Sequence, residues 1–296
     1  FSKNKIAIYF TDIVLVSLAA QIGVLPLSLY YFNQLPLLFL LANLVIIPIS
    51  TAVLIGGIII LFFNFVLPDF ALFLGKILAL IIDFMNKYIH WIAQFKSGII
   101  SNISFSVWLT IILYVVIISF IYWLYHFKSK NFKCVLLSVF LFQMSYFGIK
   151  FTENNAYELI VLNSKSSAIT IKQNNSIIAF TDNPEINLEA LNHYKRGTFS
   201  DSLLILPMRN VLSFNDKRIL VIDSVGIYKT SIRPEIIVLT QNPKINLSRL
   251  ITEIKPKLVI SDKTNYKNNN TIWQATCRKE KIPFHAIAEK GFYKLK

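Results

Sequence analysis

The chain has 296 residues, 54% of them hydrophobic, and its mean hydropathy of +0.54 is too high for a protein built around a single soluble core. Its net charge of +14 favours polyanionic partners, either anionic lipid headgroups or nucleic acid. Membrane proteins often have such an excess because their cytoplasmic loops collect Lys and Arg, so charge alone does not indicate nucleic acid. The two cysteines, Cys134 and Cys277, lie in unlike surroundings and match no metal-binding spacing.

Long uncharged apolar runs are confined to the first half of the chain, whereas the second half has the composition of an ordinary globular domain. We therefore expect a polytopic α-helical membrane domain over residues 1–150, followed by a soluble α/β domain over residues 151–296. The chain begins at Phe1 and enters an apolar segment without a recognisable signal peptide. We expect it to be the C-terminal part of a longer protein.

The apolar half contains segments long enough to cross a bilayer, whose hydrocarbon core of about 30 Å takes about 20 residues of helix. Four of them are residues 13–31, 35–66, 105–125 and 132–149. A fifth segment, residues 70–95, is less apolar because Lys76, Asp83, Lys87 and His90 recur along one helical stripe. This segment has three alternatives: it could span the membrane, lie in the interface or line a cavity. We favour spanning, which gives about five transmembrane helices.

Lysines in short loops predict which side of the membrane each loop faces. The densest cluster lies in one loop, at Lys128, Lys130 and Lys133, and a second cluster, Lys3 and Lys5, lies at the start of the chain. Both should be cytoplasmic, and four crossings between them satisfy this rule only if residues 70–95 span. The last apolar segment then runs outward. We therefore expect the C-terminal domain on the outer side of the membrane.

The second half alternates segments typical of strands with segments typical of helices. Strands are expected at residues 157–162, 168–172, 177–181, 203–206, 219–222, 236–239 and 258–260. Helices are expected after Asn187, Asn246 and Asn270, each placed as an N-cap. Residues 183–188 and 242–247 share the pattern Asn-Pro-x-Ile-Asn-Leu, which we interpret as reuse of one strand–turn–helix connection rather than as a duplication.

Polar side chains and prolines interrupt the first two apolar segments, where each buried amide or freed backbone group needs a partner. These residues are Gln21, Pro26, Asn33, Gln34, Pro36, Asn43 and Pro48. They indicate helices that are broken around a polar cavity. For Asn33 and Gln34 a simple turn between two helices is the favoured alternative. For Gln21 and Asn43, hydrogen bonding between helices explains the pattern at least as well.

The same stretch resembles the transmembrane competence domain of the ComEC family, the inner-membrane DNA channel of natural transformation. The matching positions are Ala19, Ala20, Gln21, Pro26, Leu27, Tyr30, Phe32, Pro36, Ala42, Asn43 and Pro48. The resemblance covers about residues 1–126. It implies a bacterial inner (cytoplasmic) membrane location, single-stranded DNA and the lipid bilayer as partners, and separate DNA-receptor and motor proteins. It leaves a homo-oligomer open.

Many members of that family end in a metallo-β-lactamase-like domain, an αββα fold in which His and Asp side chains hold one or two metal ions. Residues 239–246 stand where its ligand motif, H-x-H-x-D-H, is expected, and they contain no His or Asp. The second half has only two histidines, His193 and His285. By this resemblance the second half is a degenerate relative of that fold. We therefore expect no metal, no cofactor, no catalytic residue and no nuclease activity.

These observations together predict a channel component that translocates single-stranded DNA during natural transformation. The candidate residues of the DNA path are Gln21, Pro26, Asn33, Gln34, Asn43 and Pro48. The path would be passive, because the chain has no G-x-x-x-x-G-K motif with which to drive transport by ATP. Two alternatives remain: a small-molecule or lipid transporter that uses the same broken-helix cavity, and a membrane-anchored binding domain without transport.

Overall fold

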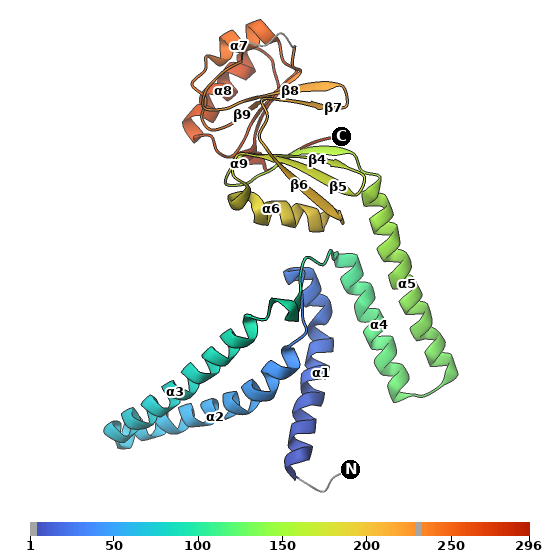
Figure 1. The fold of residues 1–296 in the computed structure, drawn as a ribbon, viewed down its shortest axis with the longest axis vertical. Coiled ribbons are helices and arrows are strands. Elements are labelled where there is room, and N and C mark those ends of the chain that lie inside the picture. The colour runs from blue at the N-terminus through green and yellow to red at the C-terminus, as the bar shows by residue number, and fades with distance from the viewer. Residues whose placement is uncertain (1–4, 229–232) are drawn as a thin grey trace. The chain divides into compact units, whose positions relative to one another are not determined.

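The computed structural model describes residues 5–228 and 233–296 (Figure 1). The chain separates into two compact units, Phe1–Gln143 and Met144–Lys296. The boundary therefore falls inside a helix, a few residues before the expected division at residue 150. Lys3 and the side chain of Lys5, which form the N-terminal basic cluster, lie outside the described part of the chain.

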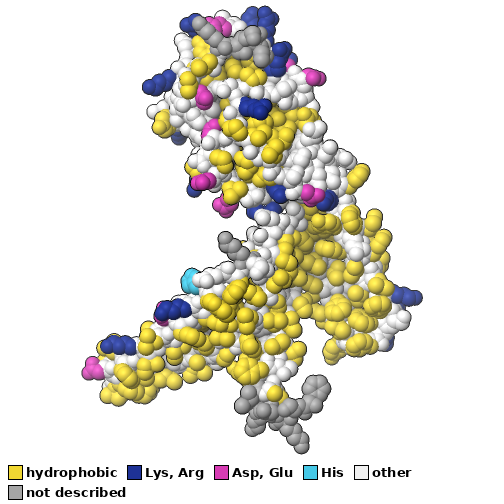
Figure 2. Space-filling view, viewed as in Figure 1, with side chains coloured by type: hydrophobic (Ala, Val, Ile, Leu, Met, Phe, Trp, Pro, Cys, Tyr) yellow, Lys and Arg dark blue, Asp and Glu magenta, His cyan; other side chains and the backbone are white. Residues whose placement is uncertain are grey.

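The first unit consists of long helices joined by short links (Figure 1). The helices are α1 (Lys5–Phe32), α2 (Phe39–Val66), α3 (Pro68–Ala93) and α4 (Val107–Tyr125), and α5 (Ser129–Asn154) continues into the second unit. All five expected segments are therefore helical over most of their length, although the second begins at Phe39 rather than at residue 35. Among the described residues, four stretches are long and apolar enough to cross a membrane: Ala7–Phe32, Phe39–Val66, Val107–Tyr125 and Ser129–Asn154. Apolar side chains dominate their exposed surface in Figure 2, as contact with lipid requires.

Helix α3 differs from the other four in its charges. Asp83 and Lys87 form an exposed ion pair of 2.8 Å along one face of the helix. Helix α2 is joined to α3 by one residue and packs along it (Figure 1). A Cβ at Gly56 of α2 would lie 3.1 Å from Leu78 of α3, so the glycine permits this close approach. Because α3 is not among the four apolar stretches, its membrane crossing stays a prediction.

The second unit contains two five-stranded sheets in the part of the chain that is described. The first, in the order β12-β3-β4-β5-β6, is antiparallel except for the β5–β6 pair. Its strands are β3 (Glu158–Val161), β4 (Ala168–Gln173), β5 (Ser176–Thr181), β6 (Ser202–Pro207) and β12 (Tyr293–Leu295). The second, in the order β11-β10-β9-β8-β7, is parallel except for the β7–β8 pair. Its strands are β7 (Val211–Phe214), β8 (Lys217–Ile222), β9 (Ile236–Leu239), β10 (Leu258–Ser261) and β11 (Phe284–Ala286).

The two sheets pack face to face around a common apolar core. Leu159 and Ile169 enter this core from the first sheet, and Ile219, Val238 and Ile260 enter it from the second. Helix α6 (Pro184–Gly197) covers the outer face of the first sheet, and α7 (Leu247–Ile254) and α8 (Lys267–Lys279) cover that of the second (Figure 1). A last short helix, α9 (Ile287–Lys290), follows β11. The layers therefore run α/β/β/α, as the resemblance implied.

All seven expected strands are present. Strands β7, β11 and β12 were not expected, since each has only three or four residues and depends on a neighbouring strand for its hydrogen bonds. Of the three expected helix starts, only that of α7 is confirmed. Its N-cap is Asn246, whose Oδ1 accepts a 3.1 Å hydrogen bond from the backbone N–H of Arg249.

The expected starts of α6 and α8 are wrong. The N-cap of α6 is Asn183, and Asn187 is buried inside the helix, where it donates to the Thr181 hydroxyl at 2.7 Å. Helix α8 begins after Tyr266, and Asn270 is likewise buried inside it, 2.5 Å from the Ser261 hydroxyl. Both asparagines tie a helix to the end of a strand, a tertiary contact that a capping pattern does not reveal.

The shared pattern of residues 183–188 and 242–247 does not give one shared connection. The first Asn of the pattern caps α6, whereas the second Asn caps α7. The difference arises before Pro243, where Gln241 and Asn242 both adopt left-handed backbone conformations, with φ of 59° and 55°. This turn carries the chain away from the helical path, so our interpretation of a reused connection is wrong.

Helix α5 is held to the second unit by a buried lysine. The side chain of Lys172, on β4, is fully buried, and its ammonium donates to the backbone carbonyl of Glu153 in the last turn of α5. It also lies 3.3 Å from the Glu153 carboxylate. A buried ammonium requires such partners, and a cation near the C-terminal end of a helix is also favourable for the helix dipole. This contact explains why the end of α5 belongs to the second unit.

Candidate functional site

The prolines expected to break α1 and α2 lie inside continuous helices. Pro26 lies within α1 and Pro48 within α2, so the expectation of helices broken at these residues is wrong. Proline fits helical φ and removes one backbone hydrogen bond, which a neighbouring group can replace. Tyrosines donate to backbone carbonyls in both regions: Tyr114 of α4 to Gly23 at 3.1 Å, and Tyr88 of α3 to Leu41 at 2.9 Å.

The break in helical structure lies instead between α1 and α2, at Asn33. This residue has a left-handed backbone, with φ of 54°. Its side-chain amide donates to the carbonyls of Leu29 and Ile103, at 3.3 and 3.1 Å, and its own carbonyl accepts from the Ile103 N–H at 2.9 Å. Asn33 is therefore a turn residue, the alternative that the sequence favoured for this position.

A short antiparallel ribbon follows Asn33. Strand β1 (Leu35–Pro36) pairs with β2 (Ile99–Ile100), which follows the 3₁₀ turn Lys96–Gly98. Gln34 is exposed at the start of the ribbon, and its carbonyl accepts a 3.5 Å hydrogen bond from the Ser28 hydroxyl. The ribbon joins two segments far apart in the sequence, and the sequence pattern gave no sign of it because each strand has only two residues.

Gln21 and Asn43 are the candidates whose amides remain available. Both side chains are partly buried, and neither forms a hydrogen bond with any described residue. One turn before Gln21, the hydroxyl of Ser17 is buried and has no hydrogen-bond partner among the described residues. Ser17 and Gln21 share one face of α1, since residues four apart in a helix are neighbours. This face of α1 therefore carries polar groups that have no partner among the described residues.

A second polar site lies in the other unit, where several strands end. Asp182 follows β5, Asp223 follows β8 and Asp262 follows β10. Gln241 follows β9 and donates a 2.6 Å hydrogen bond to the carboxylate of Asp182. The side-chain amide oxygen of Gln241 accepts from the Ser224 hydroxyl at 3.2 Å. Our sequence analysis missed the three acids, although each comes directly after a run of strand-forming residues.

Asp262 is the most buried member of this cluster, with 1% of its surface exposed. Its Oδ1 accepts from the backbone N–H and hydroxyl of Thr264, at 3.0 and 2.6 Å, and from the Asn265 amide at 3.1 Å. Its Oδ2 has no hydrogen-bond partner within the described residues. Burial raises the pKa of Asp262 above its ordinary value, although nearby hydroxyls oppose this effect. Burial also raises the pKa of Asp182, with a contribution from the charges of Asp262 and Asp223.

This cluster stands where the resemblance placed a metal site. In the part of the chain that is described, no group of three or more His, Cys, Asp or Glu side chains is arranged to hold a metal ion. His285 contacts the carbonyl of Gly291 at 3.0 Å and packs on Tyr293, and His193 lies on α6. Within the described residues, the cluster brings buried and half-buried carboxylates together with the side-chain amide of Gln241.

Comparison with known protein families gives a match in each unit. A family described as competence protein matches residues 1–127. A family described as the ComEC C-terminal domain matches residues 159–296. Comparison with curated proteins and with solved structures gives no match.

Proposed function

The chain belongs to the ComEC family of competence proteins, and from this we propose that it is a component of an inner-membrane channel that translocates single-stranded DNA during natural transformation. Membership of the family indicates a role in DNA uptake. The observation that favours translocation of a strand is the pair of partly buried amides, Gln21 on α1 and Asn43 on α2, which have no partners among the described residues.

An amide without a partner in an apolar environment costs about 1–3 kcal/mol on protein mutational scales. Such a cost is tolerated in a membrane helix when the group faces water or a polar ligand. Amides carry donors and acceptors together, so they can replace the water around phosphates and base edges without holding a charged strand tightly. Gln21 and Asn43, together with the polar face that Ser17 extends, would therefore guide the strand and still release it.

We propose that the path is passive and that direction comes from other proteins. The sequence contains no nucleotide-binding G-x-x-x-x-G-K motif, which a motor would need. Separate DNA-receptor and motor proteins would deliver and move the strand. Such a channel would also allow several copies of the chain to form a homo-oligomer.

The C-terminal unit would contact the DNA without cutting it. Hydrolysis by the related metal-dependent domains relies on His and Asp ligands, and Gln241 and Asn242 occupy the region of the ligand motif. The cluster of Asp182, Asp223 and Asp262 supplies carboxylates but no imidazole at that edge. We propose a non-enzymatic role for this unit on the outer side of the membrane, where it would meet the incoming strand.

The decisive experiment is uptake of a selectable DNA marker in a strain whose own gene is deleted and replaced by variants. Asn43→Leu should leave the protein inserted and abundant but reduce transformation about tenfold, since it removes one polar group from the path. Asn43→Gln, which keeps the amide, should restore uptake. Normal transformation by Asn43→Leu at normal abundance would remove Asn43 from the path.

Two further experiments, one on the purified chain and one in the deletion strain, separate the two rival functions. Flux of a metabolite or lipid through the purified chain, without salt-dependent binding of DNA, would favour a small-molecule or lipid transporter. Transformation that survives replacement of α1–α4 by an unrelated membrane anchor would favour a tethered binding domain. The DNA-channel proposal predicts that neither result is obtained.

A further inference from the structure

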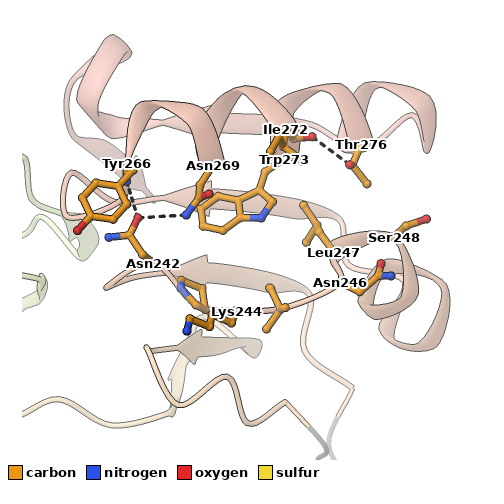
Figure 3. Close-up of a pocket in the computed structure, with 12 residues that line it drawn as sticks. Asn242, Lys244, Asn246, Leu247, Ser248, Tyr266, Asn269, Ile272, Trp273 and Thr276 are labelled. Carbon is orange, nitrogen blue, oxygen red and sulfur yellow. Dashed lines mark hydrogen bonds between the residues drawn. The ribbon is translucent and has the colours of Figure 1, made fainter.

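A cavity of about 710 Å³ opens on the outer side of the second sheet (Figure 3). One wall is the turn between β9 and α7, residues 242–248, and the other is α8, through Tyr266, Asn269, Ile272, Trp273 and Thr276. This size is within the range of about 300–1,000 Å³ typical of small-molecule sites. None of the lining residues belongs to the strand-end cluster of acids described above.

The two walls are held apart at a fixed distance by Asn242. Its Oδ1 accepts from the backbone N–H of Tyr266 at 2.5 Å and from the side-chain amide of Asn269 at 3.2 Å. Its own amide donates to the carbonyl of Thr264 at 3.1 Å, and its backbone N–H donates to Asn265 at 2.8 Å. The left-handed backbone at Asn242 directs the turn toward α8. The cavity is thus preformed and its position does not depend on the side chain of Tyr266.

The cavity presents hydrogen-bond donors that have no partner among the described residues. Trp273 has only 5% of its surface exposed, yet its indole N–H has no partner among the described residues, and Figure 3 shows the indole facing the space between the walls. The indole nitrogen is not among the buried polar atoms that lack a partner in the described structure, so its N–H is accessible from the cavity. The ammonium of Lys244 and the amide nitrogen of Asn246 are likewise without partners in the described structure. Among the described residues, no Asp or Glu lines the cavity. Such a site fits a ligand that is rich in acceptors and negatively charged.

The cavity also offers flat apolar surface. Tyr266 stands at one end with 71% of its surface exposed, and Ile272 on the next turns of α8 is 62% exposed. An exposed aromatic ring beside unpaired donors is the arrangement with which proteins hold single-stranded nucleic acid, since the ring stacks on a base and the donors meet phosphate or base oxygens. An acidic peptide would use the donors but would leave the ring unused.

We propose that this cavity binds one nucleotide of a single strand, with the base stacked on Tyr266, and with Lys244 and the Trp273 indole N–H directed at phosphate or base oxygens. This inference rests on the proposed function, because it takes single-stranded DNA as the ligand. It goes further in assigning to the C-terminal unit a specific nucleotide site, which is separate from the residues of the membrane path.

The test uses the full chain purified in detergent and a fluorescein-labelled oligothymidylate of about eight nucleotides, a length that fits the site sizes of single-strand-binding domains. Fluorescence anisotropy measures the dissociation constant. Tyr266→Ala should weaken binding about tenfold, whereas Tyr266→Phe, which keeps the ring, should bind as the unsubstituted chain does. Trp273→Phe, which keeps an aromatic ring but removes the indole N–H, should weaken binding about threefold to tenfold. Lys279→Ala, on α8 but outside the cavity, is the matched control for Lys244→Ala.

Lys244→Ala should also make the dependence of binding on salt less steep by about 0.7 in the plot of log affinity against log salt, as loss of one phosphate contact predicts for a single strand. Lys279→Ala should leave that slope unchanged. If the oligonucleotide binds equally well to the Tyr266→Ala, Trp273→Phe and Lys244→Ala variants, the nucleotide site is excluded, while the channel proposal stands. If the variants lose binding but transformation by Asn43→Leu is normal at normal abundance, Asn43 is removed from the membrane path, while the nucleotide site stands. Absence of any binding by the unsubstituted chain overturns the nucleotide site.

Discussion

The side-chain amide of Gln241 donates a 2.6 Å hydrogen bond to the carboxylate of Asp182, and this contact joins the end of β9 in one sheet to the end of β5 in the other. The backbone N–H of Gln241 is itself fixed by the Thr264 hydroxyl at 2.7 Å. A neutral donor thus stands at the edge where the metal-binding relatives are expected to place histidine. Its hydrogen bond favours the charged form of one carboxylate in a crowded acidic cluster.

The buried Asp262 makes the stability of the second unit depend on pH. Its pKa is raised in the folded state by burial, so the folded protein holds the proton more strongly than the unfolded chain. Stability is therefore lost as the pH rises from the unfolded value of 3.8 through the folded pKa. Asp262→Asn removes this charge and keeps the oxygen that accepts from Thr264 and Asn265.

We expect Asp262→Asn to raise the free energy of unfolding by about 1–3 kcal/mol at pH 8, because a neutral amide costs less to bury than a carboxylate. The gain should shrink toward zero near pH 4, where the wild-type carboxyl is protonated. Scanning calorimetry of the full chain at both pH values measures this gain in the free energy of unfolding. A variant that is less stable at pH 8 would show that the carboxylate is stabilised by contacts that the structure lacks.

Glu158 has the opposite dependence on pH. Burial alone would raise its pKa, but the hydrogen bonds and charge of Lys294, together with the Tyr194 hydroxyl at 2.8 Å, outweigh burial and lower it. Its contribution to stability is present above the unfolded value of 4.5 and is lost as the pH falls through the folded pKa.

Lys294→Met should therefore destabilise the second unit at pH 7 by about 1–3 kcal/mol, which allows for the partial exposure of the lysine. At low pH the difference from the unsubstituted chain should vanish, because a protonated Glu158 needs no cation. Lys290→Met, on the neighbouring α9, is the control for loss of one positive charge. Equal effects of the two changes at all pH values would contradict the assigned ion pair.

Asn33 should matter for folding of the membrane unit rather than for the DNA path. Asn33→Ala loses the bond to the Ile103 carbonyl and strains a backbone with φ of 54°, a conformation that costs about 1–2 kcal/mol for most residues. Asn33→Gly loses the bond but relieves the strain. We expect the unsubstituted chain to be the most abundant, the Asn33→Gly variant less abundant and the Asn33→Ala variant the least abundant. Quantitative blotting of membranes measures these abundances. Normal abundance of the Ala variant with lost DNA uptake would return Asn33 to the path.

The loop that contains Lys128, Lys130 and Lys133 predicts the orientation of the chain. If this loop is cytoplasmic, the second unit lies outside. A reporter that is active only in the cytoplasm should then be silent when it is fused after Lys296 and active when it is inserted in the loop. The reverse pattern would invert the topology, and activity of both fusions would show that α5 does not cross the membrane.

The chain should bind no transition metal tightly and cut no DNA. The full chain, purified without added metal, should contain less than stoichiometric zinc by mass spectrometry and should leave a labelled single strand intact in the presence of zinc or manganese. Stoichiometric zinc with metal-dependent cleavage would overturn this prediction. Loss of that cleavage in Asp262→Asn would then locate the unexpected site at the strand ends.

Apolar runs and alternating strand patterns determined much of the architecture. Four membrane-length helices, seven strands and the division into two parts follow from patterns that extend over many residues, because each depends mainly on the local composition. The resemblance of residues such as Gln21, Pro26 and Asn43 to the competence domain is also a property of the sequence, and the family match to residues 1–127 agrees with it.

Only the tertiary structure decided which polar residues serve the fold and which remain free. Asn33, Asn187 and Asn270 carry the same side chain as Asn43, yet each forms hydrogen bonds to residues elsewhere in the chain. The cluster around Gln241 and Asp182 and the cavity beside Trp273 are likewise formed by segments that are distant in sequence. A local pattern fixes whether a segment is helix or strand, but a hydrogen-bond partner from another segment is known only once the chain has folded.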